Sequence, residues 1–204
     1  TSSFKYAWLM DKLQSERDRG ITIEVSFSSF ETPNRIYTLI DTPGQREFIK
    51  NTIAGSAFAD VGVLVVPAGS EFDVNAVLDY ALLASAVGLK QVVVAVNKME
   101  WAKDAEKRFA SVRSALTKIL KRVGFDLGRT PFVPIAAFFG TNLMQATQTF
   151  DWYKGPSLLE ALERVEPAPA HRAAREAPLR LSVMGAETRQ VQHGRGWPTK
   201  ETVV

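Results

Sequence analysis

Two polar segments that follow apolar, β-branched runs carry the side chains best suited to bind a ligand. Residues 41–44 (Asp-Thr-Pro-Gly) close one run, and residues 97–100 (Asn-Lys-Met-Glu) close another, 56 positions later. In open α/β sheets, ligands bind outside the carboxyl ends of the strands. We therefore expect the two segments to hold one ligand from two sides.

The first segment has groups suited to a metal ion and a phosphate. The Asp41 carboxylate can hold a water bound to Mg²⁺, because Mg²⁺ takes few carboxylates and keeps several waters. Gly44 has no Cβ, so the backbone can approach a phosphate closely, and the amide of Gln45 can orient an attacking water. Residues 41–44 are also a favourable β-turn sequence, so a purely structural role is the alternative.

A threonine near the N-terminus can contribute to the same site. Thr22 follows a charged stretch, residues 16–19, that we interpret as a loop. Its hydroxyl can coordinate Mg²⁺ only when a γ-phosphate holds that loop closed. A threonine in front of a strand is otherwise unremarkable, so this prediction depends on the other motifs.

The second segment is suited to recognising guanine. Asn97 can hydrogen-bond to the edge of the base, and the stem of Lys98 can pack on its face. The Glu100 carboxylate can accept the ring N–H and the exocyclic amine of guanine, a donor pair that adenine lacks. After the next predicted strand, Ala136 and Ala137 offer backbone N–H groups to the same base.

The elements that must position these residues follow from hydrophobic periodicity. Residues 21–27 alternate as a half-exposed strand and are predicted to form an edge hairpin with residues 36–40. Continuous apolar runs predict buried parallel strands at 61–66, 91–96 and 132–135. Apolar stripes predict helices within 77–86, 109–123 and 158–165. This alternation predicts an α/β domain with a mainly parallel sheet.

Composition narrows the class of protein. The 204 residues suffice for one domain core and part of a second, and the net charge of +3 permits a nucleic-acid partner without requiring one. Cysteine is absent, which excludes disulfides and thiolate metal sites. The longest apolar runs are too short to span a bilayer and the N-terminus lacks the pattern of a signal peptide, so we expect a cytoplasmic protein without a membrane partner.

A phosphate-binding loop of the GxxxxGK[ST] type does not occur in these residues. Such a loop cradles phosphates with successive N–H groups and a lysine. The chain begins at Thr1 rather than methionine, and we expect the loop to lie upstream of that residue. The basic side chains on the predicted 109–123 helix are open to two interpretations, a solvated face or an RNA contact.

Several stretches, in order, resemble translation elongation factor 1-alpha. They are residues 3–8, 11–13 and 16–23 (its first switch region), 41–51 (its second switch), 152–162 (the end of its GTPase domain) and 177–181 (the first strand of its second domain). Release-factor and ribosome-rescue GTPases share much of this pattern. The resemblance implies a P-loop-GTPase-like sheet with helices on both faces and a GTP-dependent switch. The implied cofactors are GTP or GDP with Mg²⁺, and the implied partners are the ribosome, aminoacyl-tRNA or a related cargo, and a nucleotide-exchange factor.

The resemblance also assigns roles to the candidate residues. It places Thr22 and Asp41 at the metal, Gly44 and Gln45 at the γ-phosphate and attacking water, and the following residues at guanine: Asn97, Lys98, Glu100, Ala136 and Ala137. The chain departs from the family in having Gln45 where a histidine is usual, Glu100 for Asp, Ala136 for Ser, and a shorter segment between 72 and 81.

We expect three parts: a GTPase-like domain over 1–166 without its phosphate loop, a linker over 167–176, and the first strand and divergent tail of a β-barrel domain over 177–204. Three hypotheses for function follow. The protein is an elongation-factor-like GTPase, a pseudo-GTPase that keeps a partner surface without hydrolysis, or an inactive fragment.

Overall fold

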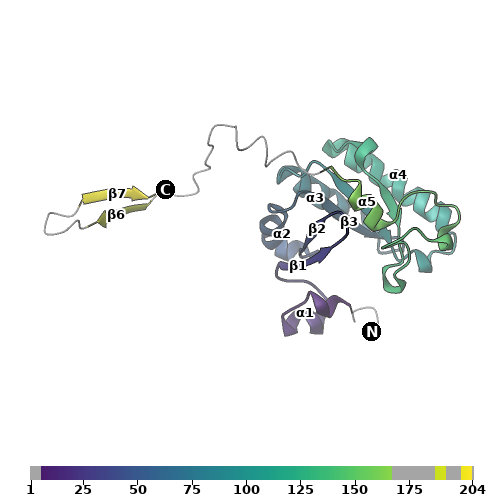
Figure 1. The fold of residues 1–204 in the computed structure, drawn as a ribbon, viewed down its shortest axis with the longest axis horizontal. Coiled ribbons are helices and arrows are strands. Elements are labelled where there is room, and N and C mark those ends of the chain that lie inside the picture. Colours follow the sequence, from purple (N-terminus) through teal and green to yellow (C-terminus); the bar gives the residue numbers. More distant parts are fainter. Residues whose placement is uncertain (1–5, 167–186, 192–198, 204) are drawn as a thin grey trace. The chain divides into compact units, whose positions relative to one another are not determined.

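The computed structural model describes residues 6–166, 187–191 and 199–203, and the chain divides into two units, 1–167 and 168–204 (Figure 1). In the second unit, β6 (Glu187–Val191) pairs antiparallel with β7 (Thr199–Val203). The candidate site residues all lie in the first unit.

The first unit contains two separate sheets. β1 (Ser26–Glu31) and β2 (Ile36–Asp41) form an antiparallel hairpin in which Ser26 lies opposite Asp41. β3 (Gly62–Pro67), β4 (Val92–Asn97) and β5 (Phe132–Pro134) form a parallel sheet in the order β3-β4-β5.

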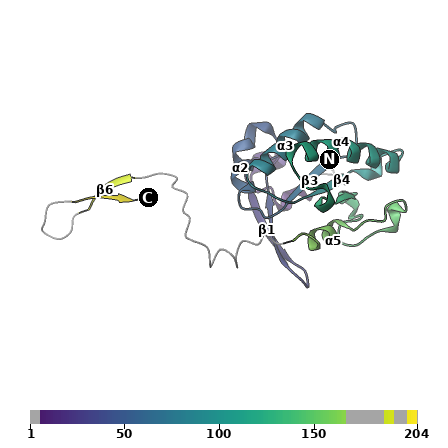
Figure 2. The ribbon, with the colours of Figure 1, turned by 90° about the horizontal axis from the view of Figure 1, so that it is seen from above.

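Helices cover both faces of the parallel sheet, as predicted. Figure 2 shows α3 (Val74–Ala86) and α4 (Ala105–Val123) on one side of β3 and β4, and α5 (Leu158–Glu163) on the other. Two further helices flank the hairpin in the sequence: α1 (Gln14–Arg19) precedes β1, and α2 (Ile49–Ser56) follows β2. Short 3₁₀ turns complete the unit: η2 (Ala7–Leu9), η3 (Arg46–Phe48), η4 (Met99–Trp101), η5 (Leu127–Arg129), η6 (Ala137–Phe139) and η7 (Gln148–Phe150).

The core is built around β4, whose residues Val92–Val96 are all buried. Because side chains alternate along a strand, Val94 and Val96 pack with α3 and α4, whereas Val93 and Ala95 pack with α5. The predicted stripe of α4 supplies Phe109, Val112, Leu116, Ile119 and Leu120 to the first cluster. The predicted parallel strands and the α/β class are therefore confirmed.

β3 is covered less well than β4. Val63 and Val65 lie beside Val93 and Ala95 in the sheet, yet they are 40% and 58% exposed. β2 and β3 are each the outer strand of their sheet, so each has an edge unpaired among the described residues.

Two predictions about local structure were wrong. Residues 16–19, interpreted as a loop, lie in α1. The strand predicted from residue 21 begins only at Ser26, because the N–H groups of Ile23 and Glu24 donate to the Glu16 carboxylate instead of to a neighbouring strand. The predicted linker (167–176) and the predicted first strand of the second domain (177–181) lie outside the described residues.

Candidate nucleotide site

Helix α2 holds the two segments that carry Thr22 and Asp41. The side-chain amide of Asn51 donates to the carbonyl of Ile23 at 2.8 Å. One residue later, the hydroxyl of Thr52 donates to the carbonyl of Pro43 at 2.7 Å, and Thr52 is only 3% exposed. Both segments are therefore fixed to one turn of a single helix.

A glycine in α2 lets these segments pack closely. A Cβ on Gly55 would lie 2.9 Å from Cγ2 of Thr42 and 2.9 Å from Cγ1 of Val25. Real Cβ contacts are essentially never that short, so only glycine fits this position without a shift of its neighbours. The structure thus brings the first two predicted segments together.

A buried carboxylate organises the backbone around Thr22. Glu16 is 2% exposed and accepts N–H hydrogen bonds from Leu13 (2.9 Å), Ile23 (2.8 Å) and Glu24 (3.0 Å). Burial by itself raises the pKa of Glu16, but the backbone hydrogen bonds outweigh it and the pKa is lowered. Glu16 is therefore a carboxylate that favours its ionised form and ties the start of α1, at Leu13, to the loop that follows the helix, at Ile23 and Glu24.

Two further carboxylates lie near Thr22. The hydroxyl of Thr22 is 3.4 Å from Oδ1 of Asp11, which is 4% exposed. The pKa of Asp11 is raised by burial and by the charge of Glu16, and the pKa of Asp41 is raised by burial and by Asp11 and Glu16. The Coulomb contributions show that these carboxylates repel one another, and a bound cation would reduce that repulsion.

Sequence reasoning missed Asp11. The sequence did offer a signal for Asp11, because it is an acidic residue at the start of residues 11–13, one of the stretches that resemble the first switch region of the family. Within the part of the chain that the structure describes, no cluster of three or more His, Cys, Asp or Glu residues is arranged to hold a metal ion. Oxygen donors from Thr22, Asp11 and Asp41 suit Mg²⁺, which retains several waters and commonly takes phosphate oxygens as well.

Gly44 and Gln45 lie in open surroundings. Both are exposed, and a Cβ added to Gly44 would meet nothing within 4 Å. Packing within the chain therefore does not require glycine here. Gln45 precedes η3 in extended conformation, and its side chain makes no hydrogen bond with any described residue.

The ends of β4 and β5 are joined by the predicted guanine-reading residues. Oδ1 of Asn97 accepts the backbone N–H of Ala137 at 3.0 Å. The N–H of Ala136 donates to the carbonyl of Thr141 at 3.2 Å. The two predicted base-reading segments therefore meet, and both of these N–H groups already have a partner inside the chain.

Lys98 adopts a left-handed backbone conformation with φ of 62°, which is uncommon outside glycine and is found at functional turns. Its ammonium lies 2.9 Å from Oε1 of Glu71, and both side chains are about half exposed. Such an exposed ion pair contributes little and exchanges readily. Glu100 lies in η4 and is exposed.

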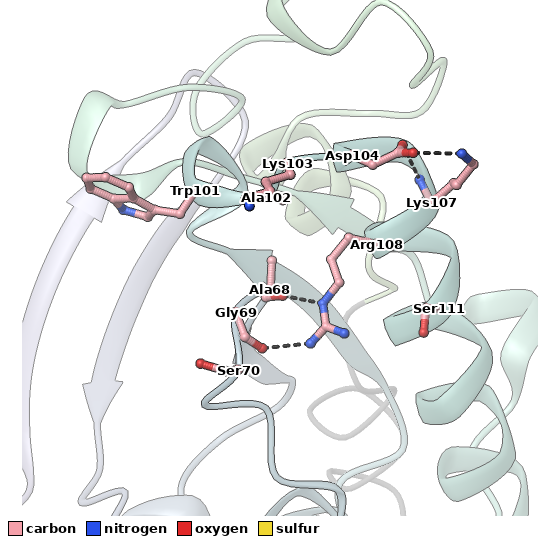
Figure 3. A pocket seen from close by; sticks show the side chains of 10 residues that line it. All are labelled: Ala68, Gly69, Ser70, Trp101, Ala102, Lys103, Asp104, Lys107, Arg108 and Ser111. Atoms are coloured by element: carbon pink, nitrogen blue, oxygen red, sulfur yellow. Dashed lines mark hydrogen bonds and ion pairs between the residues drawn. The ribbon is translucent and has the colours of Figure 1, made fainter.

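The two groups remain distinct in this structure. Among the described residues, no side-chain hydrogen bond or ion pair joins the Thr22–Asp41 group to the Asn97–Ala137 group. The cavity in Figure 3, about 560 Å³, is lined by neither group. Its lining residues are Ala68, Gly69, Ser70, Trp101, Ala102, Lys103, Asp104, Lys107, Arg108 and Ser111. A single pocket that contains both groups stays a prediction.

Comparison with known proteins decides the family. Residues 1–168 match the family model described as the elongation factor Tu GTP binding domain. The chain belongs to this family. The predicted resemblance is therefore confirmed over most of the chain.

Curated relatives agree with this assignment. The chain is 43% identical over 189 residues to elongation factor 1-alpha of Ignicoccus hospitalis, covering 89% of this chain and 42% of the relative. It is 42% identical over 189 residues to elongation factor 1-alpha of Plasmodium falciparum, covering 90% of this chain and 42% of that protein. The chain thus spans about two fifths of the length of these relatives.

A solved structure supports the fold. The crystal structure of a bacterial selenocysteine-specific elongation factor, EF-Sec, is similar with a TM-score of 0.57 at 23% identity, covering 77% of this chain and 25% of that one. At this identity the likeness concerns the fold alone. Within the described residues, every helix is too short or too polar to traverse a lipid bilayer.

Proposed function

We propose that this chain is the guanine-nucleotide-binding part of a translation factor that delivers aminoacyl-tRNA or a related cargo to the ribosome and hydrolyses GTP. The observation that carries the proposal is the family match over residues 1–168, with the candidate residues at the ends of β2, β4 and β5. The ribosome, the cargo, an exchange factor and a location in the cytoplasm all belong to this proposal.

On the metal side, Thr22, Asp11 and Asp41 would hold Mg²⁺ and its waters. When bound, the ion neutralises phosphate charge and positions the phosphates. The Thr22 loop fixed by Glu16 would present its hydroxyl, and Gly44 would let the backbone approach the γ-phosphate. Gln45, whose side chain has no described partner, would orient the attacking water.

On the base side, Asn97 would orient the guanine edge and Glu100 would accept its two N–H donors. Lys98 would leave Glu71 and pack its stem on the base, since the pair is exposed and weak. Ala136 and Ala137 would border the base from the end of β5. Their N–H groups contact it only if the present bonds to Thr141 and Asn97 are shared or exchanged.

The phosphate cradle would come from residues outside these 204. Two features support this part of the proposal. The strands β2 and β3 each have an unpaired edge among the described residues, and Val63 and Val65 expose an apolar face on β3. A further strand and helix, with the phosphate loop between them, would satisfy both the edges and that face.

A pseudo-GTPase is the second candidate. It is favoured by the changes at Gln45, Glu100 and Ala136 and by the internal bonds that already occupy Lys98 and Ala137. In this hypothesis the fold and a partner surface persist while hydrolysis is lost.

Isothermal titration of the full-length gene product with GDP and ADP, each with Mg²⁺, tests the first proposal. We expect GDP to bind at least roughly 100-fold more tightly than ADP, and Glu100→Ala to remove most of that preference. Glu31→Ala, an exposed acid on β1, is the matched control. Equal or absent binding of both nucleotides contradicts the proposal. Guanine-specific binding without ribosome-stimulated phosphate release supports the pseudo-GTPase.

A further inference from the structure

The exposed side of α4 carries an unusual distribution of charge. The nineteen residues 107–125 contain six cations and no acid. The buried side of the same helix is fully apolar and packs into the core. The charge is therefore concentrated on the side that faces solvent, which we name the α4 basic face: Lys107, Lys118, Lys121 and Arg122.

Helical geometry aligns these cations. Lys107 and Lys118 are eleven residues apart, which is about three turns, so they share one side of the helix at a separation of roughly 17 Å. Lys121 and Arg122 follow within the next turn. Ser111 and Ser114, both exposed, lie between the two lysines and offer hydroxyl groups.

Most of these cations have no carboxylate partner. Lys107 pairs with Asp104 at 2.8 Å, whereas Lys118, Lys121 and Arg122 form no ion pair with any described residue. The two other arginines of α4 are differently engaged. Arg108 donates to the carbonyls of Ala68 and Gly69, and the Arg113 guanidinium lies 5.6 Å from the ring centre of Phe132.

A large aromatic side chain lies at the N-terminal end of this face. Trp101 is 76% exposed and borders the cavity of about 560 Å³ that also contains Lys103, Ser70 and Ser111 (Figure 3). Figure 3 shows its indole directed away from the other labelled residues. An exposed indole beside a hollow is suited to stacking against an unpaired base.

The α4 basic face lacks large exposed apolar side chains, and this indicates which kind of partner it can bind. Protein interfaces are organised around apolar anchors, but none of the exposed large hydrophobic side chains among the described residues belongs to α4. Interfaces with nucleic acid are more polar and much more positive, and they tolerate spaced lysines that contact phosphates. Asp104 and Glu106 lie at the N-terminal end of α4, but residues 107–125 carry cations without an acid, and this face with one stacking platform matches the second kind.

We propose that the α4 basic face together with Trp101 binds single-stranded RNA. Phosphates lie along Lys107, Lys118, Lys121 and Arg122, and one unpaired base stacks on Trp101. This site lies on α4 and η4 and uses none of the residues assigned to the nucleotide. RNA binding can therefore be tested whether or not the protein binds GTP.

Fluorescence anisotropy with a labelled 12-nucleotide single-stranded RNA of mixed sequence, at 50 and 200 mM salt, tests the proposal. Lys118→Gln/Lys121→Gln is expected to weaken binding roughly tenfold at low salt and to reduce the slope of log K against log salt by about 1.4. The matched control, Lys50→Gln/Lys90→Gln, removes two exposed lysines from elsewhere and is expected to keep both values. Far-UV circular dichroism verifies that both variants fold.

Trp101→Ala is expected to weaken binding by roughly 5- to 150-fold, and Trp101→Phe to retain most of the affinity because a stacking surface remains. Three results overturn the proposal: no RNA binding at 50 mM salt, equal losses in the α4 variant and its control, or no effect of Trp101→Ala. A poly-glutamate peptide that competes as well as the RNA indicates an acidic protein partner and also overturns it.

Discussion

Replacing Glu16 by glutamine tests how the loop around Thr22 is held in place. The Glu16 carboxylate is buried and accepts three backbone N–H groups, two at Oε1 (Ile23 and Glu24) and one at Oε2 (Leu13). In Glu16→Gln the amide oxygen can keep the first two bonds without charge assistance. The amide nitrogen then opposes the N–H of Leu13, so that donor is left buried and unpaired.

The magnitude follows from these three bonds. Hydrogen bonds to charged groups contribute about 1.5–3 kcal/mol each and neutral ones about 1, while an unpaired buried donor costs about 1–3 kcal/mol. Two bonds that each weaken by about 0.5–2 kcal/mol and one unpaired donor give an expected loss of about 2–7 kcal/mol for Glu16→Gln. Some of this is offset by relief of repulsion with Asp11 and Asp41, whose pKa values Glu16 helps to raise. Glu24→Gln, an exposed acid in the same loop, is the control and should change stability by less than about 0.5 kcal/mol.

Amide hydrogen exchange at Ile23 and Glu24, together with urea unfolding, measures the effect. The pH dependence has a defined sign. Because the pKa of Glu16 is lowered from 4.5, its contribution is present above that value and is lost as pH falls through the folded pKa. Wild-type protection at these amides should decrease in acid, and the glutamine variant should lack this component. Unchanged exchange and unchanged unfolding in Glu16→Gln would refute the role assigned to this carboxylate.

Three other predictions concern packing, titration and base recognition. Gly55→Ala should lower the free energy of unfolding in urea by about 1–2 kcal/mol, because the contacts of 2.9 Å with Thr42 and Val25 outweigh the better helix propensity of alanine. Gly44→Ala should leave stability unchanged and weaken only nucleotide binding. Burial raises the pKa of Tyr153 to about 12, so the free energy of unfolding should fall between pH 10 and 12, and Tyr153→Phe should remove that component. The prediction is contradicted if Tyr153→Phe removes a phenol that titrates near pH 10 from the absorbance titration of the native protein. Glu100→Gln should weaken GDP binding at least roughly tenfold and favour xanthosine diphosphate, because the glutamine amide can donate to the carbonyl that replaces the guanine amine. Competition titrations in which this variant still prefers GDP argue against the role of Glu100.

Periodicity alone predicted the elements that bury apolar surface. The strands β3, β4 and β5 and the helices α3, α4 and α5 carry uninterrupted apolar runs or stripes, and burial is what those patterns report. The same reasoning failed where polar groups determine the structure. α1 is highly charged, and its one buried residue is Glu16, so its sequence resembles a solvated loop.

The candidate site shows the same division. The motifs located Asp41 and Asn97 at strand ends, which follows from simple strand boundaries. They did not reveal that Asn97 would bond Ala137, that Lys98 would pair with Glu71, or that Asp11 would lie beside Thr22, because those contacts depend on how separate elements pack. The role of Gly55 is likewise visible only once α2 lies against Thr42 and Val25.

The proposed function requires that the groups around Asp41 and Asn97 bind one guanine nucleotide. Hydrogen–deuterium exchange of the full-length gene product, titrated with GDP and Mg²⁺, can establish whether they do. We expect peptides spanning 41–45, 97–100 and 136–137 to become protected together, at the same nucleotide concentration and not with ADP. Protection of only one of these groups, or of none of them, would show that they do not share a nucleotide.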